Sequence, residues 1–390
     1  MCHVISSIVL IIFLGIITSF VFRAYLMTSL SDLTDQSKCP YCYGKEFCKE
    51  VNDVSLDNGF FGKILNLFNA KNVYYGDLNN IDVVIKKLAS NDELKHFDSA
   101  LCSVFTNSED CDLNLVTDNR NYEEIVLEIL KYRNTTHSFQ VCTPETGQDL
   151  FGDILKLRKN VDYNEYLTNV WTTLEINVEP LILQLLESED NWPFPKYYGS
   201  CGRIIVEEHR GKTLYEQDTL EWMDRAYLAV QLLYAAQNLT DNHSKYRFYL
   251  TDISSDNIAV DDNLQLTFVD LENLIIQKKF QSGLDEVHKS ENIHDSDGFA
   301  FSTQDICQHE RSDHNIYAIC YLILSKQAPY PMSKYGLLVS PPRYILIHYP
   351  QLFDLIEECV TPKVKNRFYI AEEILYYLNE ILRNSKISTS

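Results

Sequence analysis

The sequence predicts an α+β protein in which a small, mainly β lobe precedes a larger, mainly α lobe and disulfide bonds cross-link the chain. Three observations predict this class. Short apolar runs with strand character fill residues 60–88, helical patterns dominate from residue 313 onward, and ten cysteines are spread from Cys39 to Cys359. Strands first and helices later indicate a small sheet lobe on a helical lobe. With 390 residues, 45% of them hydrophobic, the chain can bury a large core.

Composition excludes some classes of partner. The formal net charge is -21, so bulk electrostatics will not bind this chain to nucleic acid or to anionic lipid. Such acidity suits a basic protein partner or divalent cations. The sequence contains neither internal repeats nor long Pro, Gly or Ser tracts.

The N-terminal segment predicts targeting to a membrane. The stretch from Val4 to Phe22 is almost wholly apolar, and its length is close to the ~20 residues that a helix needs to cross a bilayer. Residues 1–23 therefore form either a signal anchor or a cleaved signal peptide, with a buried helix of a soluble protein as a third interpretation. The protein is membrane-bound through this segment if it is not cleaved.

Cysteines and sequons favour the lumen of the secretory pathway, with the protein anchored there or secreted. An even number of cysteines after a targeting segment predicts disulfides. Two alternatives stay open: buried thiols in a reducing compartment, and a zinc site at the Cys39-Pro40-Tyr41-Cys42 motif. Asn134, Asn238 and Asn242 begin sequons and are glycosylation candidates. The disulfide candidates are Cys39, Cys42, Cys48, Cys102, Cys111, Cys142, Cys201, Cys307, Cys320 and Cys359.

Periodicity and turn residues predict the individual elements. Strands at 73–76 and 83–88, joined by a polar turn at 77–82, form a first hairpin. A second hairpin joins 258–260 to 264–269 through the turn Asp261-Asp262-Asn263. The other predicted elements are helices at 122–132, 171–186 and 220–239 and strands at 204–206 and 248–250.

We divide the rest of the chain into three segments. Residues 24–58 form a polar, Cys-rich stem, residues 59–206 form the small lobe with a long insertion at about 89–165, and residues 207–390 form the helical lobe.

Three oxygen-bearing side chains are expected to converge. Asp252 follows one strand, Asn257 opens the next, and Asp270 closes the strand after that. The hairpin turn brings Asn257 and Asp270 together at its open end, with Asp252 a few residues away. Hard divalent cations take oxygen ligands, and an aspartate outside the metal shell can orient a hydroxyl. The alternative is that these are ordinary loop residues of an acidic chain.

These residues follow a known spacing. Asp252 and Asn257 form D-x-x-x-x-N, and Asp270 stands where a D-F-G motif would begin. Upstream, the segment ending in Lys86 is similar to V-A-I-K. In these motifs the chain resembles the protein kinase superfamily.

The resemblance is closer to one branch, the divergent protein kinase domain 2 (deleted-in-autism) family, and runs from about Cys39 to Leu378. It implies a two-lobed kinase-like fold in a secretory-pathway, Golgi-associated or secreted protein. The segments that carry it are CPYCYGKEFC, KNVYYG, VVIKKL, EPLILQ, WPFPKYYGSCGR, DISSDNIAV, DLENL and DHNIYAICYL.

The resemblance also implies roles for site residues, with ATP and Mg2+ or Mn2+ as cofactors. Lys86 would hold nucleotide phosphates and pair with Glu179, and Glu207 would lie in the hinge segment at the nucleotide. Asn257 and Asp270 would bind the metal, and Asp252 would orient the acceptor hydroxyl. Asp313 would brace the catalytic-loop backbone.

Departures from an active kinase leave two functions open. No G-x-G-x-x-G covers the phosphates, Leu250 and Thr251 replace the His and Arg of H-R-D, Ser254 replaces the catalytic-loop lysine, and Glu272 replaces the glycine of D-F-G. One hypothesis is an atypical ATP:protein phosphotransferase acting on secretory-pathway or extracellular proteins. The other is an inactive pseudokinase that acts as a secreted signalling ligand or scaffold, with a secretory or cell-surface protein as partner.

Overall fold

The computed structural model describes residue 15 and residues 30–56, 72–116, 118–132, 140–187, 192–217, 219–279, 287–288, 306–329, 335–363 and 365–388. Apart from Gly15, the expected membrane segment lies outside the described residues, as does the sequon at Asn134. Within the described part of the chain, no helix is both long enough and apolar enough to span a membrane.

The chain forms two compact units. The first unit contains residues 1–122, 159–181 and 196–209, and the second contains residues 123–158, 182–195 and 210–390. The insertion predicted at about 89–165 is therefore shared between the two units. Each unit is described by itself.

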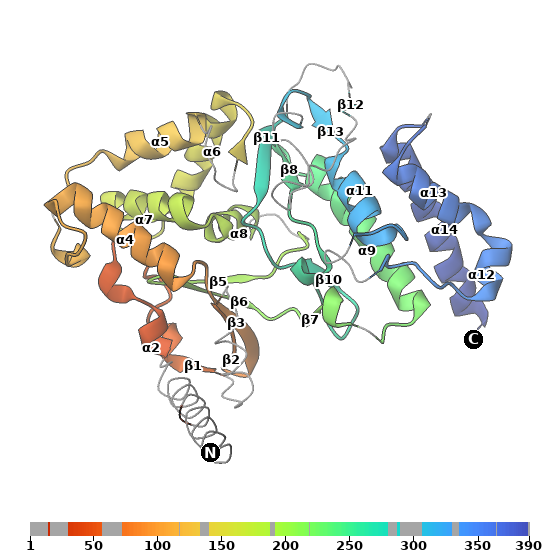
Figure 1. The fold of residues 1–390 in the computed structure, drawn as a ribbon, viewed down its shortest axis with the longest axis horizontal. Helices are drawn as coiled ribbons and strands as arrows, with labels where there is room; N and C mark the ends of the chain where they lie inside the picture. The colour runs from red at the N-terminus through yellow and green to blue at the C-terminus, as the bar shows by residue number, and fades with distance from the viewer. Residues whose placement is uncertain are drawn as a thin grey trace, which may run out of the picture. The chain divides into compact units, whose positions relative to one another are not determined.

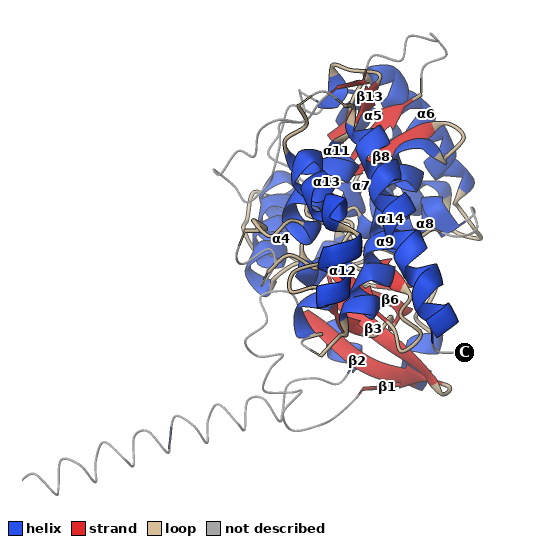
Figure 2. Cartoon of the chain, turned by 90° about the vertical axis from the view of Figure 1, so that its right-hand side faces the viewer, coloured by secondary structure: helices blue, strands red, loops and turns tan. Residues whose placement is uncertain are grey.

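The first unit is built on a five-stranded antiparallel sheet in the order β1-β2-β3-β6-β5, whose strands β1, β2, β3 and β6 are visible in Figure 2. The first predicted hairpin is confirmed, with a turn of only two residues. Asn79 and Asn80 both have positive φ angles, 55° and 67°, as a tight hairpin turn requires. The strands are β1 Val54–Leu56, β2 Asn72–Leu78, β3 Ile81–Lys87, β5 Tyr197–Cys201 and β6 Ile204–Glu208.

The two faces of this sheet differ. Side chains alternate along a strand, so Val83 and Ile85 of β3 lie on one face and Lys86 on the other. The first face packs into a core with apolar residues of 30–56, including Phe47 and Val51. A disulfide from Cys48 to Cys201 links this segment to β5. The segment expected as a stem is thus part of the core of the first unit.

Helices of the first unit surround an aromatic cluster. These helices are α2 Leu30–Leu33, α4 Asn91–Thr106 and α7 Tyr163–Ile176, with the 3-10 turns η1 Gln36–Lys38, η2 Glu50–Asp53 and η3 Leu113–Leu115. Tyr41 is buried against Phe105 and Trp171. Fully buried Arg203 donates from Nε to the Tyr41 carbonyl (3.1 Å) and pairs with Asp98.

The single helix predicted over 171–186 is in fact two helices. α7 ends at Ile176, and α8 spans Glu179–Glu187. Pro180 explains the break, because proline is tolerated in the first turn of a helix but disfavours helical geometry in the residue before it. Asn177 marks the boundary: its Oδ1 accepts the backbone N–H of Glu179 (2.9 Å).

The second unit is mainly helical, which confirms the helical pattern predicted from residue 313. α9 packs against α11 and α14, and α13 against α14 (Figure 1). The predicted helix at 220–239 is α9 Trp222–Asp241 and the one at 122–132 is α5 Tyr122–Tyr132, of which residues from 123 belong to this unit. The others are α6 Pro144–Lys156, α11 His314–Ala318, which continues as a π-helix over Ile319–Leu324, α12 Arg343–His348, α13 Pro350–Val360 and α14 Arg367–Ser388.

Short strands connect these helices. The second predicted hairpin is confirmed by the antiparallel strands β9 and β10, which form the sheet β10-β9-β7, while a second small sheet has the order β4-β11-β8. The insertion supplies β4, which pairs with β11 in parallel and which the sequence did not predict. The strands are β4 Gln140–Val141, β7 Lys212–Thr213, β8 Tyr246–Leu250, β9 Ile258–Val260, β10 Leu266–Phe268, β11 Leu274–Lys278, and the pair β12 Val287–His288 and β13 Arg311–Ser312.

All ten cysteines after Cys2 form disulfides, which confirms the main prediction and overturns the two alternatives. Both sulfurs of the Cys39-Pro40-Tyr41-Cys42 motif are used in a bridge, so the motif is not a zinc site. Every bridge lies within one unit. The pairs are Cys39–Cys42, Cys48–Cys201, Cys102–Cys111, Cys142–Cys307 and Cys320–Cys359.

Candidate functional site

In the first unit, Lys86 stands between two buried carboxylates. In the register of β3 and β6, Val84 lies opposite Glu207 and Lys86 opposite Ile205, so Lys86 and Glu207 share a face. Lys86 Nζ is 3.0 Å from Glu179 Oε1 and 2.7 Å from Glu207 Oε1. The structure thus contains the ion pair with Glu179 that the family resemblance implies, and adds a second partner.

Lys86, Glu179 and Glu207 form a trio of charged side chains that is almost completely buried. The Lys86 side chain is 11% exposed, and each glutamate side chain is 2% exposed. A buried carboxylate that loses its cationic partner is strongly destabilising. Lys86 therefore stabilises two carboxylates, and the trio carries an excess negative charge when both are ionised.

In the second unit, Asp252 and Asn257 come together directly. Asp252 follows β8, and a 3-10 turn, η5 Ser255–Asn257, leads into β9. Asn257 Nδ2 donates to the carbonyl oxygen of Asp252 (3.1 Å), which closes the loop between them. Both side chains are half-buried.

Asp270 lies beside these two residues. The backbone N–H of Val269 donates to the carbonyl of Asn257 (3.0 Å), so Asp270 lies next to Asn257 at the open end of the hairpin. Leu271 is fully buried, and the N–H of Glu272 donates to Asp270 Oδ1 (3.3 Å). Main-chain contacts thus place Asp252 and Asp270 on either side of Asn257, and the convergence of their three side-chain oxygens on one cation stays a prediction.

The ligand types at this point suit a hard cation. Amide and carboxylate oxygens bind Mg2+, which also takes oxygens from phosphate and water. No cluster of three or more His, Cys, Asp or Glu side chains suited to a metal ion occurs in the described part of the chain. A cation held by Asn257 and Asp270 would therefore need ligands from nucleotide phosphates and water.

The strand that leads to Asp252 is held by residues that sequence analysis missed. Asn315 Oδ1 accepts the N–H of Leu250 (3.1 Å), and its Nδ2 donates to the carbonyl of Phe248 (2.7 Å). His314 Nε2 is 2.8 Å from the Leu250 carbonyl. All three groups are buried, so α11 fixes the end of β8 through two side chains.

Asp313, which was expected to brace the catalytic loop, makes a buried ion pair. Its Oδ2 is 2.7 Å from Nη1 of Arg367, at the start of α14, and both side chains are almost fully buried. Arg367 also donates to the carbonyls of Cys359 and Val360. A polar run of Asp, His and Asn at the start of an apolar helix was the available signal for His314 and Asn315.

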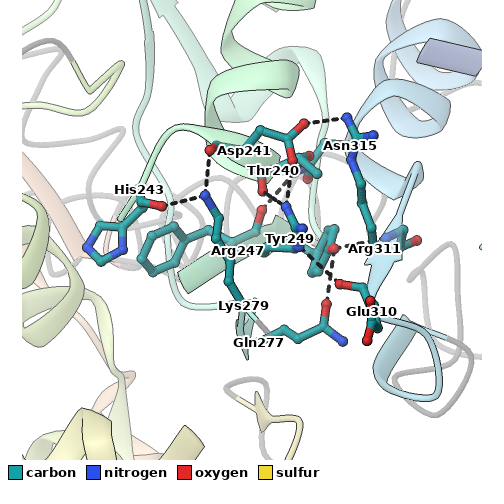
Figure 3. Close-up of polar contacts among 12 residues, drawn as sticks. Thr240, Asp241, His243, Arg247, Tyr249, Gln277, Lys279, Glu310, Arg311 and Asn315 are labelled. Atoms are coloured by element: carbon teal, nitrogen blue, oxygen red, sulfur yellow. Dashed lines mark hydrogen bonds and ion pairs between the residues drawn. The ribbon is translucent and has the colours of Figure 1, made fainter. Parts of the chain in front are cut away.

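A polar network fixes the other end of β8 (Figure 3). Asp241, the last residue of α9, is 2.5 Å from Arg247 Nη1 and 2.5 Å from Arg311 Nη2. Lys279 Nζ donates to the carbonyls of Asp241 and His243, both at 2.5 Å. Three cations thus gather at a helix C-terminus, where the helix dipole favours positive charge.

The same network fixes the segment before α11. Arg247 Nε donates to the Glu310 carbonyl (3.0 Å), and the N–H of Ser312 donates to the Tyr249 hydroxyl (3.0 Å). Burial raises the pKa of Tyr249 to about 12, so the hydroxyl remains neutral at physiological pH. Hydrogen bonds and ion pairs therefore hold both ends of β8, the strand that leads to Asp252.

Comparisons with known proteins identify the class. Residues 170–362 match a family model described as "Protein-kinase domain of FAM69". The chain therefore has a kinase-like fold, with the sheet in the first unit and most helices in the second. A solved structure of Rv3197 with erythromycin from Mycobacterium tuberculosis has a TM-score of 0.24 and 12% identity over 53% of this chain and 44% of that chain, which is too low to show a shared fold.

Full-length relatives then define the family. Human "Divergent protein kinase domain 2A" is 30% identical over 395 residues, covering 91% of this chain and 90% of that protein. The Xenopus tropicalis protein of that name is 29% identical over 396 residues, with the same coverage. Mouse "Divergent protein kinase domain 2B" is 33% identical over 120 residues, 31% of this chain and 27% of that protein. The chain belongs to the divergent protein kinase domain 2 family.

Proposed function

We propose that this protein binds ATP with Mg2+ or Mn2+ in the secretory pathway and transfers phosphate to hydroxyl groups of secretory or extracellular proteins. One observation supports the proposal: Lys86, Asp252, Asn257 and Asp270 of the kinase motifs are present, and local contacts hold them. Lys86 is paired with Glu179, and Asn257 bonds to the main chain of Asp252 and lies beside Asp270.

Each residue has a separate role in this proposal. Lys86 supplies positive charge to the nucleotide phosphates. Asn257 and Asp270 would hold the divalent cation, which neutralises charge on the phosphates when bound. Asp252 accepts a hydrogen bond from the acceptor hydroxyl and orients it for attack.

A second candidate function is that of a pseudokinase that acts as a secreted ligand or scaffold. Ser254, in place of the catalytic-loop lysine, is buried and cannot supply a charge to the transferred group. Gly76 of β2 serves packing, because a Cβ there would lie 2.8 Å from the Ser55 carbonyl of β1. Its presence is therefore explained without phosphate binding.

The secretory location rests on the disulfides and sequons. Five bridges are typical of an oxidising compartment. Asn238 and Asn242 are both exposed, near the end of α9 and just after it. Treatment of protein from a secretory host with a general N-glycosidase should shift its mobility on a gel. No shift, together with cytosolic protease access in intact microsomes, would contradict a lumenal location.

Nucleotide-dependent thermal stability tests the main proposal. ATP with Mg2+ or Mn2+ at 100 times its Kd should stabilise the protein by about 2.7 kcal/mol, whereas ATP with a chelator should not. Asp270→Ala should abolish the shift, because a methyl group cannot bind the cation. Lys86→Ala should weaken binding less, since the cation still holds the phosphates, but it should also lower the stability of the free protein because Glu179 and Glu207 lose their cationic partner.

Asp262→Ala is the matched control, because Asp262 is an exposed turn residue of the same hairpin. It should keep the full melting shift. If the wild-type protein shows no metal-dependent shift at millimolar nucleotide, the enzyme hypothesis is wrong and the scaffold becomes the better account.

A further inference from the structure

The position of Glu207 has a consequence for nucleotide binding. The ammonium group of Lys86 is closer to Glu207 (2.7 Å) than to Glu179 (3.0 Å). Glu207 is in the middle strand of the pairing β3-β6-β5, where it lies opposite Val84 on one side and Tyr197 on the other. Strand β6 is paired on both sides, and the Glu207 carboxylate lies 2.7 Å from the ammonium group of Lys86.

The net charge of Lys86, Glu179 and Glu207 determines how this site interacts with a phosphate. A lysine paired with one glutamate forms a neutral couple, whereas Lys86 with two ionised glutamates carries a net charge of about −1. Charges interact strongly where water is excluded, and this trio is almost completely buried. A polyphosphate that approaches Lys86 therefore meets repulsion from the second carboxylate.

We infer that Glu207 restrains Lys86 and lowers the affinity of the first unit for nucleotide polyphosphates. The inference rests on the proposed nucleotide binding and adds its regulation by a residue of the sheet. Glu207 competes with phosphate for the ammonium group of Lys86. Its effect grows with the number of phosphates and is absent for a nucleoside.

Glu207→Gln tests the inference, because glutamine keeps the shape of the side chain and removes its charge. Affinities for adenosine, ADP and ATP, each with Mg2+, are measured by calorimetry on the full chain purified from a secretory host. We expect ATP to bind at least ~10-fold more tightly to the variant than to the wild type. The gain should be smaller for ADP, and the affinity for adenosine should not change.

Glu208→Gln is the matched control. Glu208 follows Glu207 in β6 and lies opposite Val83, so its side chain is on the other face of the sheet. The variant loses the same formal charge but should change the affinity for ATP less than twofold. An equal gain in both variants would show that net charge alone is responsible and would overturn the inference.

Other outcomes also decide the question. If Glu207→Gln weakens ATP binding as Lys86→Ala does, Glu207 holds Lys86 in place for the nucleotide and the inference is wrong. If wild type and variant bind ATP equally well, only this inference fails. If neither binds any nucleotide, the proposed function fails with it. Glu207→Met, an uncharged side chain of similar length, replaces Glu207→Gln if that variant does not fold.

Discussion

Asp252 is held through its main chain, which separates its position from its chemistry. The carbonyl of Asp252 accepts Asn257 Nδ2 (3.1 Å), and this bond does not involve the carboxylate. Asp252→Asn should therefore keep the ATP-induced melting shift. Its rate of ATP turnover should fall by about 10²- to 10⁴-fold, because the amide is a poor base for the acceptor hydroxyl.

The measurement compares ATP turnover and melting in the same preparations. Asp256→Asn is the control, since Asp256 is exposed within the same loop and should leave turnover unchanged. Equal turnover in Asp252→Asn and wild type would exclude a chemical role for this carboxylate.

Among the contacts of single residues, the sequence predicts those that depend on a local turn. Asn257 and Asp270 meet because a hairpin returns the chain on itself within a few residues. Asn315 was missed because its partner Leu250 is 65 residues away. The partnership of Glu207 with Lys86 depends on which residue of β6 lies opposite which residue of β3, and spacing along the chain does not determine that register.

Among the elements, β8 depends on α11. Asn315 is fully buried and satisfies the Leu250 N–H and the Phe248 carbonyl. Asn315→Ala leaves both backbone groups unsatisfied, and each such group costs about 1–3 kcal/mol. We expect the free energy of unfolding to fall by roughly 2–5 kcal/mol in urea denaturation.

Asn384→Ala is the control for this substitution. Asn384 is exposed on α14 and bonds to the Tyr349 hydroxyl, so its loss should cost less than about 0.5 kcal/mol. Equal losses in the two variants would mean that Asn315 does not support β8.

Helix α6 is attached to β8 through Asp153, which predicts a pH dependence. Burial alone raises the pKa of Asp153, but hydrogen bonds from Lys156, Lys245 and Tyr246 outweigh it and lower the pKa to about 2. The stabilisation from this group is thus fully present above the unfolded-state pKa of about 3.9. It is lost as the pH falls from about 4 toward 2.

Asp153→Asn removes this dependence. Urea denaturation should show the variant less stable than wild type at pH 7 and at pH 5, with the difference shrinking between about pH 4 and pH 2. Asp149→Asn on the same helix is the comparison, because Asp149 forms an ion pair with Lys278 in which both side chains are more than a third exposed. A stability difference that persists at pH 2 would contradict this account of Asp153.

The sequence did not predict the pairing of β4, the strand that directly precedes α6, with β11. Gln140 of β4 lies opposite Ile275, and a two-residue strand is too short to show an alternating pattern. The helices α5 and α9 were predicted because each has enough residues for helical periodicity. The position of β4 therefore depends on its pairing with β11 in the folded chain, which local sequence does not specify.

Over the whole molecule, the sequence predicted the fold class and the use of the cysteines but not their pairing. Strand-first and helix-later order, together with the motifs around Lys86 and Asp252, was sufficient for the kinase-like class. The pairing depends on which distant segments pack together. Cys48 meets Cys201 across 153 residues only because residues 30–56 join the core of the sheet.

Loop length predicts how the bridges differ in their contribution to stability. Cys142–Cys307 closes a loop with a sequence separation of 165, and Cys102–Cys111 one of 9. A crosslink stabilises by restricting the unfolded chain, and the effect grows with the logarithm of loop length. The two bridges should therefore contribute about 5 and about 2.6 kcal/mol in this description.

Paired substitutions test this prediction without leaving a free thiol. Cys142→Ser with Cys307→Ser should lower the free energy of unfolding by about 2.5 kcal/mol more than Cys102→Ser with Cys111→Ser. Urea denaturation of the oxidised proteins measures both, and the count of remaining thiols after denaturation verifies that the other four bridges have formed. Equal losses, or a larger loss from the short loop, would show that local packing around Cys102 rather than the unfolded chain sets the stability. The same experiment shows whether the insertion depends on its bridge to Cys307 to stay attached to β11. An insertion that is already detached in the folded protein exposes less new surface on unfolding, which would lower the denaturant dependence of unfolding.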